Sequence, residues 1–241
     1  MTSGESSGRI GRTAYDEAYP RAADALTLYV WRTPAFHLTE WTAAATIPVI
    51  AVTMVEALLS ALVFWLFWKG HYWPGLLLAA TVSLLSTVAM MLSRMGHSHG
   101  RANQARIALN LIASLLWWWA WEHGLAAYGR PLEPVYATMV LWVVIGGSVA
   151  INVIEGLVLH RHNMQIHAWR PIDTQFRLAS AARNANLVIL AAALLLFRRP
   201  DSGLVLVAWW TLITLIVHAV RFAQLTELQA RRQKIASWLD R

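Results

Sequence analysis

Apolar residues fall into six long blocks along the chain, and short polar segments separate them. Each block is long enough, or nearly so, to cross a bilayer as an α-helix, which takes about 20 residues. The fifth block is short by itself, and we expect its helix to begin within 183–186. The predicted spans are 44–68, 73–94, 106–127, 135–159, 184–198 and 203–223. The pattern predicts an all-α, polytopic membrane protein with a bundle of six transmembrane helices.

Composition agrees with this pattern. The chain is 57% hydrophobic and only 14% charged, whereas a soluble domain carries about 25% charged residues. It contains no cysteine, which excludes disulfides, Cys-ligated zinc and iron–sulfur clusters. The first forty residues have several charges and no apolar core, so we do not expect a cleavable signal peptide there.

The basic residues are divided unequally between the two faces of the predicted bundle. An even number of spans puts both termini on one face, together with the loops 95–105 and 160–183. Sixteen of the twenty Lys and Arg residues fall on this face. Because cytoplasmic loops carry the excess of Lys and Arg, we expect both termini in the cytoplasm. The net charge of +7 then suits anionic lipid head groups, and no motif for nucleic acid accompanies it.

The chain divides into three predicted parts. Residues 1–40 form an N-terminal arm, in which 14–32 fit either a cytoplasmic interfacial helix or a segment packed on the bundle. Residues 41–225 form the transmembrane domain, and 226–241 a cytoplasmic tail. The predicted extracytoplasmic connections are too short to fold separately, so we expect chemistry or partner binding on the cytoplasmic side.

Tryptophan is abundant, with 14 residues that gather mostly at predicted span ends. Indole is amphipathic and favours the bilayer interface, so we interpret these residues as an aromatic belt. Contact with another protein, or stacking on a bound lipid or pigment, is the alternative. The interface candidates are Trp65, Trp68, Trp117, Trp118, Trp119, Trp121, Trp209 and Trp210.

Two carboxylates lie within predicted spans, where ionisable groups are functional candidates. Glu155 lies near the cytoplasmic end of the fourth span, and we favour a structural ion pair with an arginine of the 160–183 loop. Glu56 lies well inside the first span. A proton relay from Glu56 would need ionisable groups on other spans, for which His123 and His218 are candidates, but spacing alone does not show it.

The fourth-to-fifth connection carries two further sets of polar residues. One set fits an anion site, because arginine suits phosphate, and the alternative is a loop held by Arg–Asp pairs. It consists of Arg170, Asp173, Arg177 and Arg183. The other set can ligate a pigment or haem, or pack as ordinary membrane histidines. It consists of His160, His162, His167 and His218. We predict no cofactor, and we expect bound phospholipid.

Several short motifs carry a family resemblance. They are WWWAWEHG from Trp117 to Gly124, Glu155-Gly156, Ile166-His167-x-Trp169-Arg170-Pro171-x-Asp173, Phe176-Arg177 and Arg183-Asn184-x-Asn186. On these motifs the chain resembles a bacterial branch of the CDP-alcohol phosphatidyltransferase family, over about residues 30–225. The resemblance implies a bacterial inner-membrane protein with six spans, often homodimeric, that is preceded by a cytoplasmic juxtamembrane helix. It also implies displacement of CMP from a CDP-linked lipid or alcohol by a hydroxyl.

The family's signature, D-x2-D-G-x2-A-R and then G-x3-D-x3-D, supplies aspartates that hold two divalent metals against the pyrophosphate. This chain has no Asp or Glu between Glu56 and Glu122. The corresponding positions are Leu85, Val88 and Ala89 in the first half of the signature, and Ala102, Arg106 and Asn110 in the second. The gap predicts that the metal site of the family is absent.

Two histidines near this gap, His97 and His99, can ligate a transition metal but are otherwise plain loop residues. Neutral imidazoles would not offset a pyrophosphate charge. The sequence therefore predicts a pseudoenzyme, serving as an accessory or structural subunit of a larger bacterial membrane complex, with an energy-transducing or photosynthetic host as one option. An active or atypical lipid transferase, and a lipid- or nucleotide-binding module, are the alternatives.

Overall fold

The computed structural model describes residues 10–20, 23–97, 100–231, 235 and 237–238. For residues 97 and 100–107 only the backbone is described. Within these residues every regular element is helical and there is no strand, which agrees with the all-α prediction.

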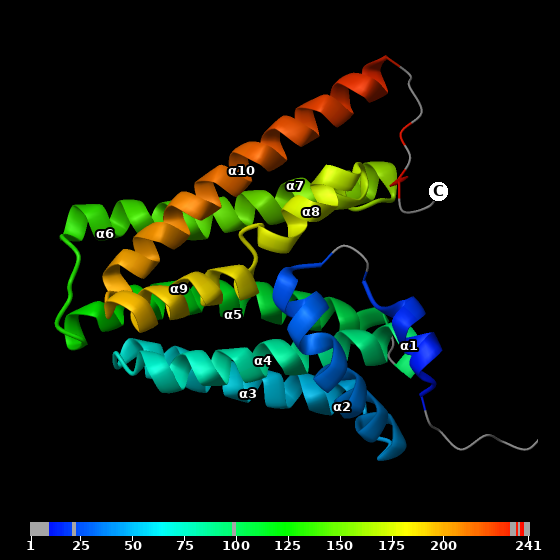
Figure 1. The fold of residues 1–241 in the computed structure, drawn as a ribbon, viewed down its shortest axis with the longest axis horizontal. Coiled ribbons are helices and arrows are strands. Elements are labelled where there is room, and N and C mark those ends of the chain that lie inside the picture. Colours follow the sequence, from blue (N-terminus) through cyan, green and yellow to red (C-terminus); the bar gives the residue numbers. More distant parts are fainter. Residues whose placement is uncertain (1–9, 21–22, 98–99, 232–234, 236, 239–241) are drawn as a thin grey trace, which may run out of the picture.

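Long helices make up the body of the molecule (Figure 1). They are α3 (Val49–Trp68), α4 (Tyr72–Leu92), α5 (Gly100–Ala127), α6 (Pro134–Leu141), α7 (Gly147–His162), α9 (Arg183–Phe197) and α10 (Pro200–Ala230). The segment η3 (Trp142–Gly146) joins α6 to α7 without a break in the helix. Shorter segments follow α4 and α7, namely η2 (Ser93–His97), η4 (Ile166–Ala168) and α8 (Pro171–Ala179).

Four of the described helical segments are long and apolar enough to cross a membrane. They are Val49–Trp68, Tyr72–Gly96, Pro134–His162 and Pro200–Ala230. The pair α8 and α9, bent by 46°, makes a fifth if the two count as one span. These helices support a membrane protein with four or five candidate spans. The predicted count of six exceeds this, because α5 is less apolar along its length than these four segments and α9 alone is short.

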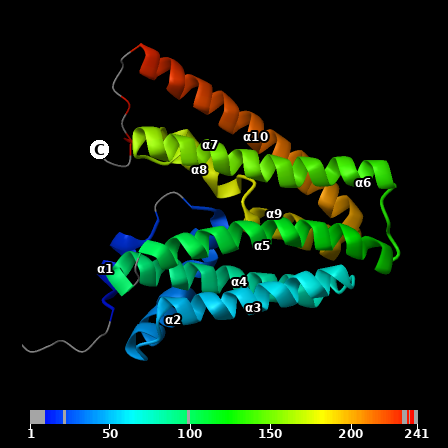
Figure 2. The ribbon, with the colours of Figure 1, turned by 180° about the vertical axis from the view of Figure 1, so that it is seen from behind.

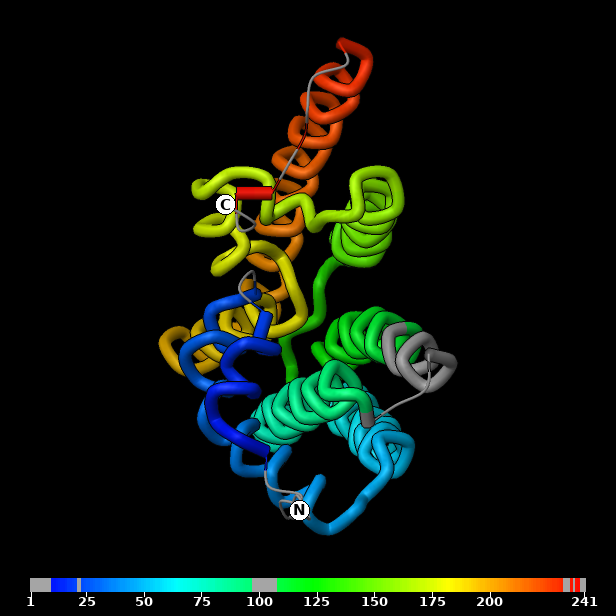
Figure 3. Tube along the Cα trace, turned by 90° about the vertical axis from the view of Figure 1, so that its right-hand side faces the viewer, coloured from blue at the N-terminus to red at the C-terminus, as the bar shows by residue number. Residues whose placement is uncertain are grey.

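The connections separate into two groups along the long axis of the molecule. Figures 1 and 2 show the α3–α4, α5–α6 and α9–α10 connections at one end. The elements α1, α2 and α8 lie toward the other end. Helix α3 packs on α4 and α5, while α10 packs on α9 and α7. Figure 3 shows the C-terminal part of α10 projecting beyond the other helices.

The largest apolar core is built around three tryptophans of α5 that we expected at a membrane interface. Trp117, Trp118 and Trp121 are buried completely or almost so. The indole Nε1 of Trp117 donates to the Ser60 carbonyl (3.0 Å), and that of Trp121 donates to the Pro200 carbonyl (3.1 Å). The interface assignment is wrong for these three, because positions 117, 118 and 121 share the helix face that packs inward.

The other five interface candidates lie nearer the surface. Trp65, Trp119 and Trp209 are exposed, whereas Trp68 and Trp210 are partly buried. Trp210 donates its Nε1 hydrogen to the Ala179 carbonyl (2.5 Å). Hydropathy identified where these residues lie along the span, but the helix face decides whether each one points outward.

The N-terminal arm is folded against the bundle. Its elements are α1 (Arg12–Ala18), η1 (Leu26–Trp31) and α2 (Arg32–Ala44). Tyr15, Tyr19 and Phe36 form an apolar cluster with Met91 of α4, and α2 packs along α4. The structure thus contains an arm packed on the bundle, and its role as a cytoplasmic interfacial helix stays a prediction.

Candidate functional site

A cavity of about 410 Å³ lies between the arm, α4, α5, α7 and the beginning of α9. Its charged lining residues are Arg94, Arg177 and Arg183, together with Asp24 and Glu155. Most of the other lining side chains are hydroxyls and amides. A volume of this size suits a small-molecule ligand, for which pockets of about 300–1,000 Å³ are typical.

The walls formed by α4 and α5 are polar but uncharged. Ser86 and Thr87 of α4 and Asn110 of α5 line the cavity. Leu85 and Val88, which stand near the first two aspartate positions of the family signature, pack instead in an apolar cluster between α2, α3 and α4. The described side chains of these two walls therefore offer no carboxylate to a divalent metal.

The other residues considered for metal binding in this region are only partly described. The side chain of Arg106 lies outside the described residues. The same holds for the side chain of His97 and for all of His99. Their suggested roles stay predictions.

Arg183 is the best-anchored cation of the cavity. Its Nη1 donates to Asn110 Oδ1 (2.5 Å), and its guanidinium lies 5.6 Å from the centre of the Trp117 ring. Arg183 is also the first residue of α9, and the N-cap residue Ala182 provides no side-chain cap. The first N–H groups of a helix have no intrahelical acceptor and favour an anion. A guanidinium and a helix N-terminus thus meet at one wall.

The other two arginines of the cavity are tied to neighbouring elements. Arg94 donates from Nη1 to the Ala18 carbonyl of the arm (2.8 Å). Arg177 donates from Nη1 to Glu155 Oε1 (3.0 Å), so an arginine of the loop pairs with Glu155. Arg94 and Arg177 therefore both line the cavity, and each is held by a hydrogen bond to a neighbouring element.

The predicted four-residue anion set is not assembled as expected. Arg177 and Arg183 line the cavity, but Arg170 stacks on the Trp169 ring at 4.0 Å. Asp173 is buried and forms an ion pair with Arg221 of α10 (2.7 Å). The prediction is wrong for Arg170 and Asp173, because α8 begins at Pro171 and directs its first turn toward α10.

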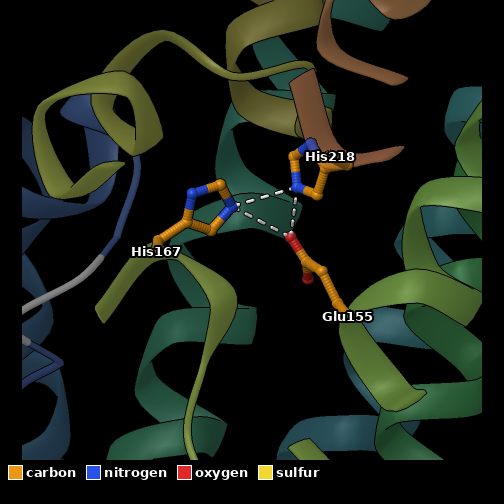
Figure 4. Close-up of side chains that lie close together, drawn as sticks. All are labelled: Glu155, His167 and His218. Atoms are coloured by element: carbon orange, nitrogen blue, oxygen red, sulfur yellow. Dashed lines mark hydrogen bonds and ion pairs between the residues drawn. The ribbon is translucent and has the colours of Figure 1, made fainter. Parts of the chain in front are cut away.

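Glu155, His167 and His218 converge from three separate elements, α7, η4 and α10 (Figure 4). The Nε2 atoms of His167 and His218 lie 3.1 and 3.2 Å from Glu155 Oε1 and 3.1 Å from each other. Both imidazoles are buried. Burial lowers the pKa of His167 below its usual range, which favours the neutral ring.

Sequence reasoning named these three residues but did not connect them. Glu155 was expected in an ion pair, and the two histidines were considered as separate pigment ligands. Residues 155, 167 and 218 lie too far apart in the chain for any local spacing to signal a cluster. Of the other two candidates, His160 is exposed and His162 is partly buried at the end of α7.

The second intramembrane carboxylate, Glu56, is buried in α3 and does not line the cavity. The relay partners suggested for it lie in other environments. His218 belongs to the cluster with Glu155, and His123 stacks on Trp68 with ring centres 3.5 Å apart. The described residues thus give Glu56 no place in the site.

No family model matches the chain, and no curated protein matches it either. The family resemblance therefore stays a prediction, and the cavity is the feature of the described residues that bears on function. Guanidinium groups, amides, hydroxyls and a helix N-terminus are the groups that bind phosphate oxygens.

Proposed function

We propose that the chain is a bacterial inner-membrane protein that binds a phosphate-bearing lipid head group or nucleotide in this cavity without catalysing phosphatidyl transfer. The observation that carries the proposal is the pairing of Arg183 with the uncapped start of α9 in a polar cavity. The proposal combines the pseudoenzyme and the lipid-binding interpretations of the sequence.

The charge of the cavity supports an anionic ligand. Three arginines face two carboxylates, and both carboxylates already have partners. Asp24 accepts hydrogen bonds from Thr27 and Asn184. Glu155 accepts one from Arg177. The cavity lining thus carries more guanidinium than carboxylate groups, and phosphate binds guanidinium groups with charge-assisted hydrogen bonds.

The absence of transferase activity follows from the chemistry of the walls. Two divalent metals facing a pyrophosphate need several anionic oxygen ligands. The segment from 57 to 121 has no carboxylate at all, and the described residues of α4 and α5 present hydroxyls and an amide in its place. A bound CDP-linked lipid would therefore keep its CMP group.

The proposed topology has six spans with both termini in the cytoplasm. Four helical segments are long and apolar enough to cross a membrane. We assign α5 and α9 as spans too, because both run alongside these segments (Figure 2). The 16 to 4 distribution of basic residues sets the orientation. Cysteines introduced at the exposed His71 of the α3–α4 connection and at the C-terminus of the Cys-free chain should differ in labelling by a membrane-impermeant maleimide. Equal labelling of both from the periplasm would contradict this topology.

The binding proposal is tested with the purified full-length protein in detergent. We expect anionic phospholipid and CDP-diacylglycerol to raise the unfolding temperature, because a ligand of the folded state stabilises it by mass action. Arg183→Gln should weaken binding about tenfold or more, since hydrogen bonds to charged groups contribute about 1.5–3 kcal/mol. Arg170→Gln is the matched control, because Arg170 belongs to the same connection but lies outside the cavity. Equal loss in both variants, or no stabilisation of the wild type, would contradict the proposal.

A second proposal, a role as an accessory subunit of a membrane complex, is favoured by the outer face of α10. Exposed apolar side chains follow one another there at spacings of three and four residues, which is the spacing of a helix-packing seam. They are Leu206, Trp209, Ile213, Ile216 and Val220. We propose that this seam contacts a helix of another subunit or of a second copy.

Purification in mild detergent tests the subunit role. A stoichiometric partner or a homodimer should accompany the wild type and be lost from the double variant Trp209→Ala/Ile213→Ala. Trp65→Ala/Leu62→Ala on α3 removes exposed apolar surface elsewhere and serves as the control. A monomer without partners in all three preparations would contradict this second proposal.

A further inference from the structure

We propose that Glu155, His167 and His218 form a binding site for a divalent transition metal, with zinc as the best fit. The three residues come from α7, η4 and α10, and Figure 4 shows their polar atoms directed at one another. This site differs in position and in ligand type from the aspartate set that the family resemblance implies. It also does not depend on the phosphate site at Arg183.

The spacing of the three atoms fits tetrahedral zinc. Their mutual separations are 3.1, 3.1 and 3.2 Å. A tetrahedral ion with bonds of about 2.0–2.1 Å places its ligand atoms about 3.3–3.4 Å apart. Two imidazoles and one carboxylate are also an established ligand set of zinc sites that keep a fourth position open. The atoms would have to move by only a few tenths of an ångström.

The hydrogen bonds of His218 leave a lone pair directed at the cluster. Its Nδ1 lies 2.8 Å from the Thr214 carbonyl oxygen, which can only accept, so Nδ1 carries the hydrogen. In the neutral ring Nε2 then has no hydrogen, and its lone pair faces Glu155 Oε1 at 3.2 Å. A backbone carbonyl that fixes the outer nitrogen is the arrangement found behind metal-ligating histidines.

Arg177 and Glu155 both contact His167 Nε2. The Nη1 atom of Arg177 lies 3.5 Å from His167 Nε2 and 3.0 Å from Glu155 Oε1, and a guanidinium has donors only. His167 Nε2 also lies 3.1 Å from the Glu155 carboxylate. The ring therefore either donates to Glu155 as its Nε2–H tautomer or presents an Nε2 lone pair to the cluster. In the lone-pair form of His167, three electron pairs converge within 3.2 Å and favour a metal ion between them, whereas in the Nε2–H form the hydrogen of His167 lies there.

Either a metal ion or the hydrogen of an imidazole N–H can lie between these atoms, and the two have different consequences. An N–H hydrogen makes the cluster a structural hydrogen-bond network, with no affinity for zinc above that of surface histidines. A metal needs an open side, and Glu155 and Arg177 both line the cavity, so water or a ligand oxygen can reach the fourth position. Arg177 opposes a dication by its charge, which lowers the affinity without blocking this side.

Metal analysis of the purified full-length protein tests the proposal. After treatment with chelator and exposure to Zn²⁺, we expect one zinc per chain. His167→Gln and His218→Gln should each weaken binding by more than about 100-fold, because even outer-shell partners contribute 10–100-fold. His160→Gln is the matched control, since it removes an exposed imidazole from the end of α7. Absence of bound zinc in the wild type, or unchanged zinc in His218→Gln, would overturn the proposal.

A spectroscopic measurement on the wild type covers the case in which a variant does not fold. Co²⁺ should give the visible absorption of a tetrahedral site, and one equivalent of Zn²⁺ should abolish it. An octahedral spectrum that zinc does not displace would instead overturn the assignment. Arg177→Gln separates this site from the phosphate site. We expect it to bind zinc at least as tightly as the wild type, and a loss of zinc in that variant would count against the assigned ligands.

Discussion

At the scale of single residues, Asp16 of α1 joins α1 to α2 within the arm by an ion pair with Arg32. Arg32 lies 2.9 Å from its carboxylate, and Arg12 approaches the other oxygen. The hydrogen bond from Arg32 holds the pKa of Asp16 below its ordinary value of 3.8. The group is exposed, so its contribution is small and screened by salt.

The sign of this pKa shift predicts how the arm responds to acid. A carboxyl whose pKa is lowered on folding adds stability that is complete above pH 3.8 and is lost as the pH falls through the folded value. The protection of α1 amides from hydrogen exchange, after correction for the intrinsic pH dependence of exchange, should therefore fall below about pH 4 in low salt. Asp16→Asn should exchange faster at neutral pH and lose this acid dependence. Identical pH profiles for the wild type and Asp16→Asn would refute the prediction.

Trp121 and Trp119 provide a matched pair of indoles on α5. Trp121 is buried and donates to the Pro200 carbonyl, whereas Trp119 is 45% exposed. Trp121→Phe removes a buried donor and should cost about 1–3 kcal/mol, seen as a lower unfolding temperature in detergent. Trp119→Phe should change it little. Equal effects of the two substitutions would show that Trp121 is not the buried member of the pair.

The partner of a residue could be predicted from the sequence where it follows from the residue's position along a predicted span. It could not be predicted where it depends on which way the side chain points. An intramembrane Glu155 needs a cation, so a pairing with the following loop was foreseeable, and Arg177 provides it. The burial of Trp117 was not foreseeable, because apolarity on all sides of a span hides which face points inward. The pairing of Asp173 with Arg221 joins residues 48 positions apart, which no local spacing reveals.

At the scale of elements, α5 crosses α3 where a glycine allows close approach. A Cβ at Gly124 would overlap the Phe67 carbonyl oxygen, whereas one at Gly156 on α7 would meet nothing within 4 Å. Gly124→Ala should therefore separate α3 from α5 and cost about 3 kcal/mol. Gly156→Ala should stabilise its helix by about 0.5–1 kcal/mol. Thermal unfolding of both variants checks the opposite signs, and destabilisation by Gly156→Ala alone would contradict the packing described.

The elements themselves were largely predictable, since long apolar blocks can satisfy their backbone in a bilayer only as helices. The bends and breaks between these helices were less predictable. The bend of 46° between α8 and α9 places the start of α9 against the cavity. From the hydropathy pattern, only an approximate beginning of this span could be predicted. The arm was left open between two arrangements because its few apolar residues suit either a bilayer surface or a protein surface.

At the scale of the whole molecule, the cavity exists because five elements from distant parts of the chain leave a polar space between them. Asn184 at the start of α9 donates to Asp24 of the arm, which closes one side. The sequence identified the missing carboxylates, since that is a property of one segment. The presence of the cavity depends on packing across the whole fold and could be found only in the structure.

The central claim is that this cavity holds a phosphate-bearing ligand without transferring its phosphatidyl group. Native mass spectrometry of the purified protein with CDP-diacylglycerol, a hydroxyl acceptor and Mg²⁺ or Mn²⁺ tests it in one measurement. We expect one intact CDP-lipid per chain, a bound fraction that falls in Arg183→Gln but not in Arg170→Gln, and no free CMP. Metal-dependent release of CMP by the wild type, or no retained lipid in it, would rule out a non-catalytic binding cavity.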